Sequence, residues 1–348
     1  MSHTFILTDA SNLFFRQIKM CNPQLGIDSA IGMALHLILY SMKKEYTRWQ
    51  GSHCVIFMEG RSWRKDYYTG YKADRAVTFA LQTEKEQEDH KILVETFDDF
   101  IEYLDNKTNM TVLQNPRAEA DDNIAIWIEA HPDDKHILIS SDSDFFQLLR
   151  YPNVTLYDPV KDIIIKQDGV YDDKGKKLSF VLNGKGKIKA GKADSNFICE
   201  EKWYEWALFL KCIRGDATDN IFSAYPNVRE NGTKNQVGIR EAYEDRSNQG
   251  YNWNNFMQQK WIDHNEVEQK VKDRYEFNRK LIDLNEIPND IKIESLGIIA
   301  EETGRKNIPA IEIGHHFMKF TGKHDLKKIG DNALAFMPML KSKYKEDQ

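Results

Sequence analysis

Short apolar runs alternate with longer helical patterns along the first part of the chain. The runs are four to six residues long and apolar at successive positions, which is typical of strands buried on both faces. The predicted strands are His3–Thr8, His53–Met58, Met110–Leu113 and His136–Ser140, and the predicted helices are Ile27–Tyr46, Leu81–Leu104 and Ala120–Ala130. Strands and helices that alternate at this spacing indicate βαβ units. We therefore expect an α/β fold with a parallel central sheet flanked by helices.

The pattern changes in the second half of the chain. A stretch from Lys174 to Ala193 is rich in Lys and Gly and has few large side chains, so we expect a mobile basic loop at about residues 168–195. Other expected elements are strands at Val154–Tyr157, Asp162–Lys166 and Leu178–Leu182, helices at Phe145–Leu149, Trp203–Ile213, Gly238–Tyr243 and Trp261–Leu284, and short helices beyond Asn289. The apolar peptide Asn332–Leu340 is expected to pack into the core rather than to bind a sliding clamp.

Acidic residues follow the predicted strands. They are Asp9, Glu59, Glu119, Asp121, Asp122, Asp142 and Asp144, and two further acids, Asp216 and Asp219, follow the predicted helix Trp203–Ile213. Since the carboxyl ends of parallel strands share one edge of a sheet, the first seven acids should converge there. A single acid at a strand end is usually a cap or a hydrated loop residue, but the whole series is harder to explain in that way.

Composition narrows the class of protein. The chain has 348 residues, 41% of them hydrophobic and 29% charged, with a net charge of −6. No apolar run approaches the roughly 18 residues of a membrane helix, and the first residues do not resemble a signal peptide. Four cysteines without a CxxC pair and ten histidines without an HExxH pattern argue for reduced thiols and against zinc. We expect a cytoplasmic protein.

The charge distribution changes how the net charge is interpreted. A net charge of −6 by itself argues against nucleic acid, yet seven lysines and no acid lie between Lys174 and Lys192. The acids cannot share a pocket unpaired, because each would raise the pKa of its neighbours. Two Mg²⁺ ions, or Mn²⁺ in their place, would satisfy such a set of oxygen ligands and could clamp a phosphodiester.

Six motifs carry a resemblance to a known family. LTDASN, FMEG, YKADR, EADD, ISSDSDF and GDATDN occur in order, and over residues 4–245 the chain resembles the structure-specific 5′-nucleases, the flap endonuclease and 5′–3′ exonuclease superfamily. The resemblance implies a PIN-like nuclease core at residues 1–200, with a helical arch at about 61–106. It also implies a helical region at 201–348, with a helix-turn-helix-type element that binds duplex DNA at about 214–245.

The resemblance also implies roles for individual acids. Asp9, Glu59, Glu119, Asp121, Asp142 and Asp144 match metal-site acids of the family, Asp216 and Asp219 match the pair that completes the shell of a second metal, and Asp122 matches an outer-shell position. One position departs from the family, which usually has Asp where this chain has Glu59. Whether Glu59 ligates a metal directly is left open.

The resemblance also implies roles in catalysis and nucleic-acid binding for several basic and aromatic residues. Lys72 is assigned to the scissile phosphate, with Arg75, Arg64 and Arg61 assisting, and Tyr71 to stacking on a terminal base. Arg240, in a partial match to the family's duplex-binding loop, is assigned to DNA phosphates, while a K⁺ site there is doubtful because the loop is long. Expected partners are DNA and RNA–DNA hybrids, with a single-strand-binding protein or a sliding clamp as candidates, and the chain is expected to be a monomer.

These residues predict a Mg²⁺-dependent 5′–3′ nuclease that cuts flaps, nicked duplex or RNA primers during replication, in a bacteriophage-infected cell. A catalytically weak junction-binding protein of the same fold is the alternative, and Glu59 and the long duplex-binding loop motivate it. A phosphatase is set aside because its pair of aspartates would lie at the first strand, which here ends in Asp9 alone. The balance of exonuclease and flap activity, and of RNA and DNA preference, is left open.

Overall fold

A nine-stranded sheet forms the centre of the computed structural model, which describes residues 2–22, 26–263, 265–304 and 306–345. The strand order is β3-β2-β1-β4-β5-β6-β7-β8-β9. The first five strands run parallel, and they are β1 (Thr4–Asp9), β2 (His53–Phe57), β3 (Thr111–Leu113), β4 (Lys135–Ile139) and β5 (Val154–Asp158). The predicted parallel strands and the α/β class are confirmed.

Helices cover both faces of the parallel strands because successive strand residues point to opposite sides. On one face, Ile6 and Ile56 pack with α1 (Ala10–Met20), α2 (Ile27–Arg48) and α5 (Glu84–Lys107). On the other face, Phe5 and Leu7 pack with α6 (Ala120–Ala130). Fully burying a side chain of this size stabilises the fold by about 1.5–3 kcal/mol, so these short strands are strongly held.

Strands β6 to β9 correct the expectation of a mobile basic loop. They are β6 (Ile163–Lys166), β7 (Gly169–Asp172), β8 (Lys177–Leu182) and β9 (Ile188–Ala193), and they extend the sheet as an antiparallel meander, so the sheet is mixed. Leu178, Phe180 and Ile188 lie in the same apolar core as Trp203. The composition misled because the lysines occupy exposed positions at the edge of the sheet, where few apolar side chains are needed.

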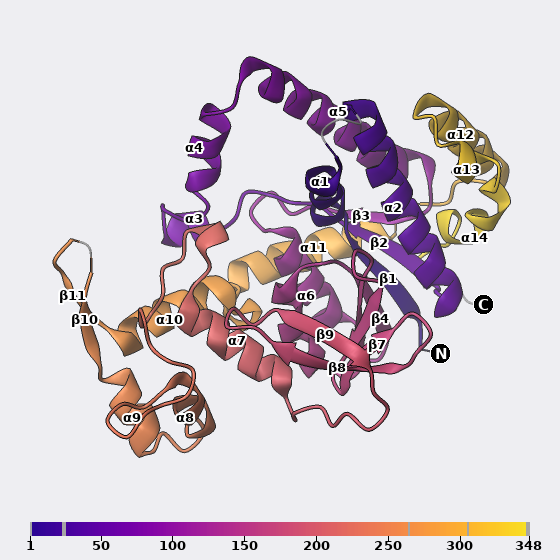
Figure 1. Cartoon of the computed structure of the whole chain (residues 1–348). Coiled ribbons are helices and arrows are strands. Elements are labelled where there is room, and N and C mark those ends of the chain that lie inside the picture. Colours follow the sequence, from indigo (N-terminus) through magenta and orange to yellow (C-terminus); the bar gives the residue numbers. More distant parts are fainter. Residues whose placement is uncertain (1, 23–25, 264, 305, 346–348) are drawn as a thin grey trace.

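The segment from α3 to α5 forms an arch beside the core. Helix α3 (Arg64–Tyr67) starts it, α4 (Asp74–Ala80) has no buried residue, and α5 begins at a capping box between Thr83 and Glu86. Figure 1 shows α4 and the start of α5 standing away from the sheet. A helix without a buried face gains no stability from the core, so the arch depends on its two ends.

A second group of elements follows the meander, except for one 3₁₀ helix that lies between β4 and β5. It comprises the 3₁₀ helices η2 (Ser143–Arg150) and η3 (Ala217–Asp219), the helices α7 (Trp203–Arg214), α8 (Ile239–Glu244), α9 (Tyr251–Met257) and α10 (Val271–Ile282), and the hairpin β10 (Lys260–Ile262) and β11 (Glu268–Lys270). The predicted helix at Trp261–Leu284 is therefore wrong before Val271, where the hairpin lies. Part of α7 packs with α8, α9 and α10 in a separate apolar cluster.

The last helices return to the sheet. After η4 (Leu284–Glu286), α11 (Asn289–Thr303) packs on α6, and α12 (Ala310–Lys323) packs on α5. Both helices are longer than the short helices that the sequence predicted. Helix α13 (Lys327–Gly330), η5 (Ala333–Ala335) and α14 (Met337–Leu340) close the chain. Phe336, Met339 and Leu340 are buried, which confirms core packing of the C-terminal peptide. None of the described helices has the length and apolarity that a membrane span requires.

Candidate metal centre

Asp9 anchors the carboxyl edge of the sheet at the end of β1. Its carboxylate accepts hydrogen bonds from the backbone N–H of Asn12 (3.2 Å) and from the hydroxyl of Ser140 (3.2 Å). The residue is 5% exposed. Burial, followed by the negative charges of Glu59 and Asp142, raises the pKa of Asp9 to about 8. A metal-free chain thus holds a carboxyl group here that resists ionisation.

Glu59 follows β2 and reaches the start of α6. Its carboxylate accepts a hydrogen bond from the backbone N–H of Ala120 at 3.2 Å. Loss of hydration and the charge of Glu119 raise the pKa of Glu59. The longer side chain therefore lies among the other acids.

The start of α6 carries a buried ion-pair network. The guanidinium of Arg64 donates to Asp122 (2.9 and 2.8 Å) and to Glu119 (3.1 Å), and the indole N–H of Trp63 also donates to Asp122 (3.0 Å). Burial would raise the pKa of Glu119, but Lys72 and Arg64 hold it below its usual value. Burial and the charge of Asp122 raise the pKa of Asp121, which has no cation of its own within ion-pair distance among the described residues.

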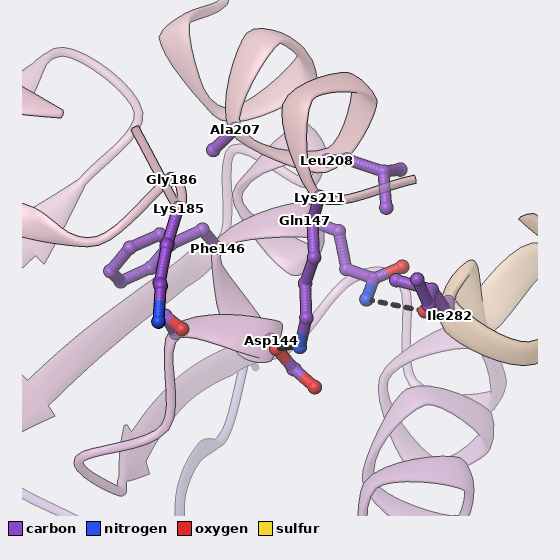
Figure 2. Close-up of a pocket in the computed structure, with 10 residues that line it drawn as sticks. Asp144, Phe146, Gln147, Lys185, Gly186, Ala207, Leu208, Lys211 and Ile282 are labelled. Atoms are coloured by element: carbon purple, nitrogen blue, oxygen red, sulfur yellow. Dashed lines mark hydrogen bonds and ion pairs between the residues drawn. The ribbon is translucent and has the colours of Figure 1, made fainter. Parts of the chain in front are cut away.

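Asp142 and Asp144 follow β4. Asp142 accepts from the backbone N–H of Asp144 (3.1 Å) and turns the chain into η2. Asp144 forms an ion pair with Lys211 of α7 (Figure 2). The same ammonium lies 2.8 Å from Asp216. Burial would lower the pKa of Lys211, but Asp144 and Asp216 raise it, so the ammonium stays charged.

Asp216 and Asp219 face this cluster from the turn that follows α7. Burial would raise the pKa of Asp216, yet Lys211 and the hydrogen bonds of Thr218 lower it to about 2. Asp219 accepts from Arg75 at 3.1 Å, and the Lys72 ammonium lies 4.0 Å away. Lys72 also pairs with Glu119, so it joins the two acidic clusters at the foot of the arch.

The backbone of Lys72 adopts a conformation that non-glycine residues rarely use, with φ at 54°. Its N–H donates to the carbonyl oxygen of Asp219 at 3.0 Å. This bond ties the foot of the arch to the turn that carries the second acidic pair. The strained position places the ammonium between Glu119 and Asp219.

Two sets of carboxylates are close enough to hold cations. Oxygens of Glu119, Asp121 and Asp122 lie within 4.8 Å of one another, and so do oxygens of Asp144, Asp216 and Asp219. Among the described residues, only five of the nine predicted acids have a cationic side chain within ion-pair distance, and those cations are Arg64, Lys72, Arg75 and Lys211. Excess negative charge on oxygen donors fits hard divalent cations such as Mg²⁺ or Mn²⁺.

The predicted nucleic-acid residues lie in different surroundings. Tyr71 is 3% exposed and its hydroxyl donates to Glu119, so its ring would have to move before it could stack on a base. Arg75 and Arg61 are exposed near the arch. Arg240 stacks over Trp206 and pairs with Glu200, away from the acids. These assignments stay predictions.

Sequence reasoning missed Lys211, Asn12 and Ser140. Lys211 interrupts the apolar run from Phe209 to Ile213, and a charge inside that otherwise apolar run was the available signal. Asn12 lies 3.5 Å from Asp142 and Ser140 donates to Asp9, so both position acids. Short polar residues beside a strand end carry no comparable signal.

The mixed sheet with helices on both faces, an arch beside it and acids at its carboxyl edge is a PIN-like α/β fold. A family model described as the 5′-3′ exonuclease N-terminal resolvase-like domain matches residues 4–175. The ribonuclease H of Enterobacteria phage T4 is 25% identical over 201 residues, 56% of this chain and 54% of the T4 protein, so the match spans about half of that relative.

Solved structures agree with this fold. The T5 5′-exonuclease with bound zinc ions matches with a TM-score of 0.56 at 18% identity, over 86% of this chain and 99% of the T5 chain. The bacteriophage T5 flap endonuclease in a complex with DNA and metal ions matches with a TM-score of 0.53 at 17% identity, over 86% and 98%. Residues 4–175 therefore resemble a 5′-3′ exonuclease N-terminal domain, and the chain shares its fold with the T5 5′-exonuclease.

Proposed function

We propose that the chain is a divalent-metal-dependent 5′–3′ nuclease that hydrolyses phosphodiesters in DNA flaps, nicked duplex or RNA primers paired with DNA. The observation that carries the proposal is the convergence of two carboxylate clusters, joined by Lys72, at the foot of the arch. Relatives named as a ribonuclease H and a 5′-exonuclease support the class of reaction. We also propose that the protein acts as a monomer in the host cytoplasm. A single-strand-binding protein or a sliding clamp is a candidate partner.

Two Mg²⁺ ions, one at each cluster, would activate water and stabilise the leaving 3′-oxygen. Asp121 and Glu119 would hold the first ion, with Asp9, Glu59 and Asp142 completing its surroundings, and Asp144, Asp216 and Asp219 would hold the second. Both oxygens of Asp122 already accept hydrogen bonds from Arg64. Asp122 and Arg64 therefore position Glu119 rather than contact substrate, so we assign them a supporting role.

Lys72 and Arg75 are the cations placed to meet a phosphate. Each pairs with Asp219 or Glu119, and Arg75 is 60% exposed, so its guanidinium can turn toward a strand that enters at the arch. A fixed cation beside the phosphate stabilises the charge that develops in the transition state. Lys72 lies deeper, where water is scarce and this stabilisation is stronger.

A catalytically weak junction-binding protein is the second candidate. Glu59, in place of the family's usual Asp, favours it because the longer side chain changes the geometry around the first ion. The first candidate predicts cleavage of 5′-labelled flap, nicked and RNA–DNA substrates in Mg²⁺, with at least ~100-fold less cleavage by Asp144→Asn. Tight flap binding with no cleavage in Mg²⁺ or Mn²⁺ would instead support the second. Equal cleavage by the wild-type protein and by Asp144→Asn would overturn the first candidate function.

A further inference from the structure

The β8–β9 hairpin carries a row of lysines that the proposed chemistry does not use. Lys185, Lys187, Lys189 and Lys192 are exposed. Within the described part of the chain, no carboxylate lies within ion-pair distance of these four side chains. Strand β9 is at the end of the sheet and pairs with β8 alone. Clustered cations without counter-charges raise the local concentration of a polyanion.

The turn of this hairpin is well defined. The side-chain oxygen of Asn183 accepts hydrogen bonds from the backbone N–H groups of Lys185 (2.9 Å) and Lys187 (3.0 Å). The Asn183 backbone also exchanges hydrogen bonds with Gly186 (2.8 Å) and Lys187 (2.9 Å). The backbone positions of the two lysines are therefore set before any ligand binds.

Gly186 places this turn against α7. It is buried, its φ is +73°, and a Cβ atom there would lie 3.0 Å from the carbonyl oxygen of Ala207. Only glycine fits both the left-handed backbone and the close approach to the helix. Since α7 also carries Lys211, the contact fixes the hairpin beside the second acidic cluster.

Lys185 consequently lies at the edge of the candidate metal centre. It lines one pocket together with Asp144 and Lys211, and Figure 2 shows its side chain on the same side as Asp144. Lys187 directly precedes β9 and Lys189 lies within it, so the two exposed lysines flank the buried Ile188 and lie on the outward face opposite to it. The row of lysines begins at the acids and continues along the outer edge of the sheet.

We propose that the β8–β9 hairpin binds the phosphate backbone of the substrate, with Lys185 next to the second acidic cluster and Lys187 and Lys189 at the start of β9. The inference rests on the proposed function, because it takes the substrate to be nucleic acid. Residues two apart on a strand are about 7 Å apart, a distance that corresponds to about two of the ~3.4 Å axial steps between the charges of one DNA strand, so the lysines can contact phosphates of the same strand. Contacts to phosphate do not depend on base sequence.

Another explanation for edge lysines is that they prevent sheets from pairing edge to edge. The test separates the two roles with a triple variant, Lys185→Ala, Lys187→Ala and Lys189→Ala, in the full chain. The matched control is Lys319→Ala, Lys327→Ala and Lys328→Ala, which removes three exposed lysines from α12 and α13. Fluorescence anisotropy measures binding to a 5′-flap DNA in EDTA, so that no cleavage occurs, and light scattering measures association.

The hairpin variant should bind on the order of 10- to 100-fold more weakly, and its slope of log Kd against log salt should fall by about 2 to 3, while the control matches wild type. Wild-type affinity and salt slope in the hairpin variant would overturn the inference, and increased association without a change in DNA binding would assign the lysines to edge protection. Wild-type protein that binds through the hairpin but does not cleave would overturn the nuclease proposal alone.

Discussion

Arg64 and Asp122 form a bidentate ion pair, in which two guanidinium nitrogens donate to the two carboxylate oxygens at 2.9 and 2.8 Å. The two side chains are 1% and 0% exposed. The sequence suggested an assisting cation and an outer-shell acid, each facing the reaction. The structure instead connects the arch to α6 through this pair, and the network extends to Glu119. Its principal effect should therefore be on stability and on the position of Glu119.

Removing one partner of this pair tests that role. Arg64→Ala should lower the free energy of unfolding by about 3–5 kcal/mol, because Asp122 would remain buried without a counter-charge. Arg61→Ala is the control, since its pair with Asp66 is exposed and contributes about 0–1 kcal/mol. Urea unfolding in EDTA measures both. A loss below 1 kcal/mol for Arg64→Ala would contradict the structural role.

Lys211 should compete with a divalent ion for Asp144 and Asp216. Lys211→Met removes the ammonium but keeps much of the apolar stem, so the metal-free protein should lose about 3–5 kcal/mol of stability. The same variant should gain more from Mg²⁺ than wild type, because the freed carboxylates bind the ion without displacing a lysine. Thermal unfolding with and without Mg²⁺ measures the difference. An equal shift in Tm for the two proteins would show that Lys211 does not compete.

The raised pKa of Asp9 predicts how the stability of the metal-free chain changes with pH. Its folded pKa is about 8 against a usual value of 3.8, so the folded state holds a proton that the unfolded state releases. The stability gained from this proton is complete below about pH 4 and is lost as the pH rises toward 8. In EDTA, Asp9→Asn should therefore become progressively more stable than wild type between pH 5 and about pH 8.

Urea unfolding at several pH values checks this difference. Asp28→Asn provides the control, because that carboxyl lies in the first turn of α2, outside the acidic edge. A constant difference between Asp9→Asn and wild type would contradict the raised pKa. Mg²⁺ should reduce the difference measured in EDTA, since an ion favours the ionised wild-type side chain.

Glu59 should contribute charge to the first ion's surroundings. Glu59→Gln keeps the length of the side chain and its hydrogen bond to Ala120, but it removes one negative charge. The Mg²⁺ concentration for half-maximal cleavage should rise about 10-fold. Glu59→Asp keeps the charge and restores the family's usual residue, so it should stay near wild type or cleave faster. An unchanged Mg²⁺ requirement in Glu59→Gln would remove Glu59 from the site.

The sequence by itself determined the α/β class, the parallel strands and the edge at which the acids meet. These features follow from local pattern, because a strand buried on both faces is apolar at every position and its end lies at a known edge. Asp9, Asp142 and Asp144 could be located in this way, and the motifs added Asp216 and Asp219. The resemblance then extended this arrangement to a family.

Only the tertiary structure decided which charges face one another. Lys211 meets Asp144 across 67 positions of sequence, and Arg64 meets Asp122 across 58, so no local pattern records either pair. The basic stretch from Lys174 to Lys192 resembled a loop because an edge strand needs few apolar residues. It forms strands because β7 pairs with β8 and because Gly186 fits against α7. Pairing and packing between distant segments supplied what composition and periodicity lacked.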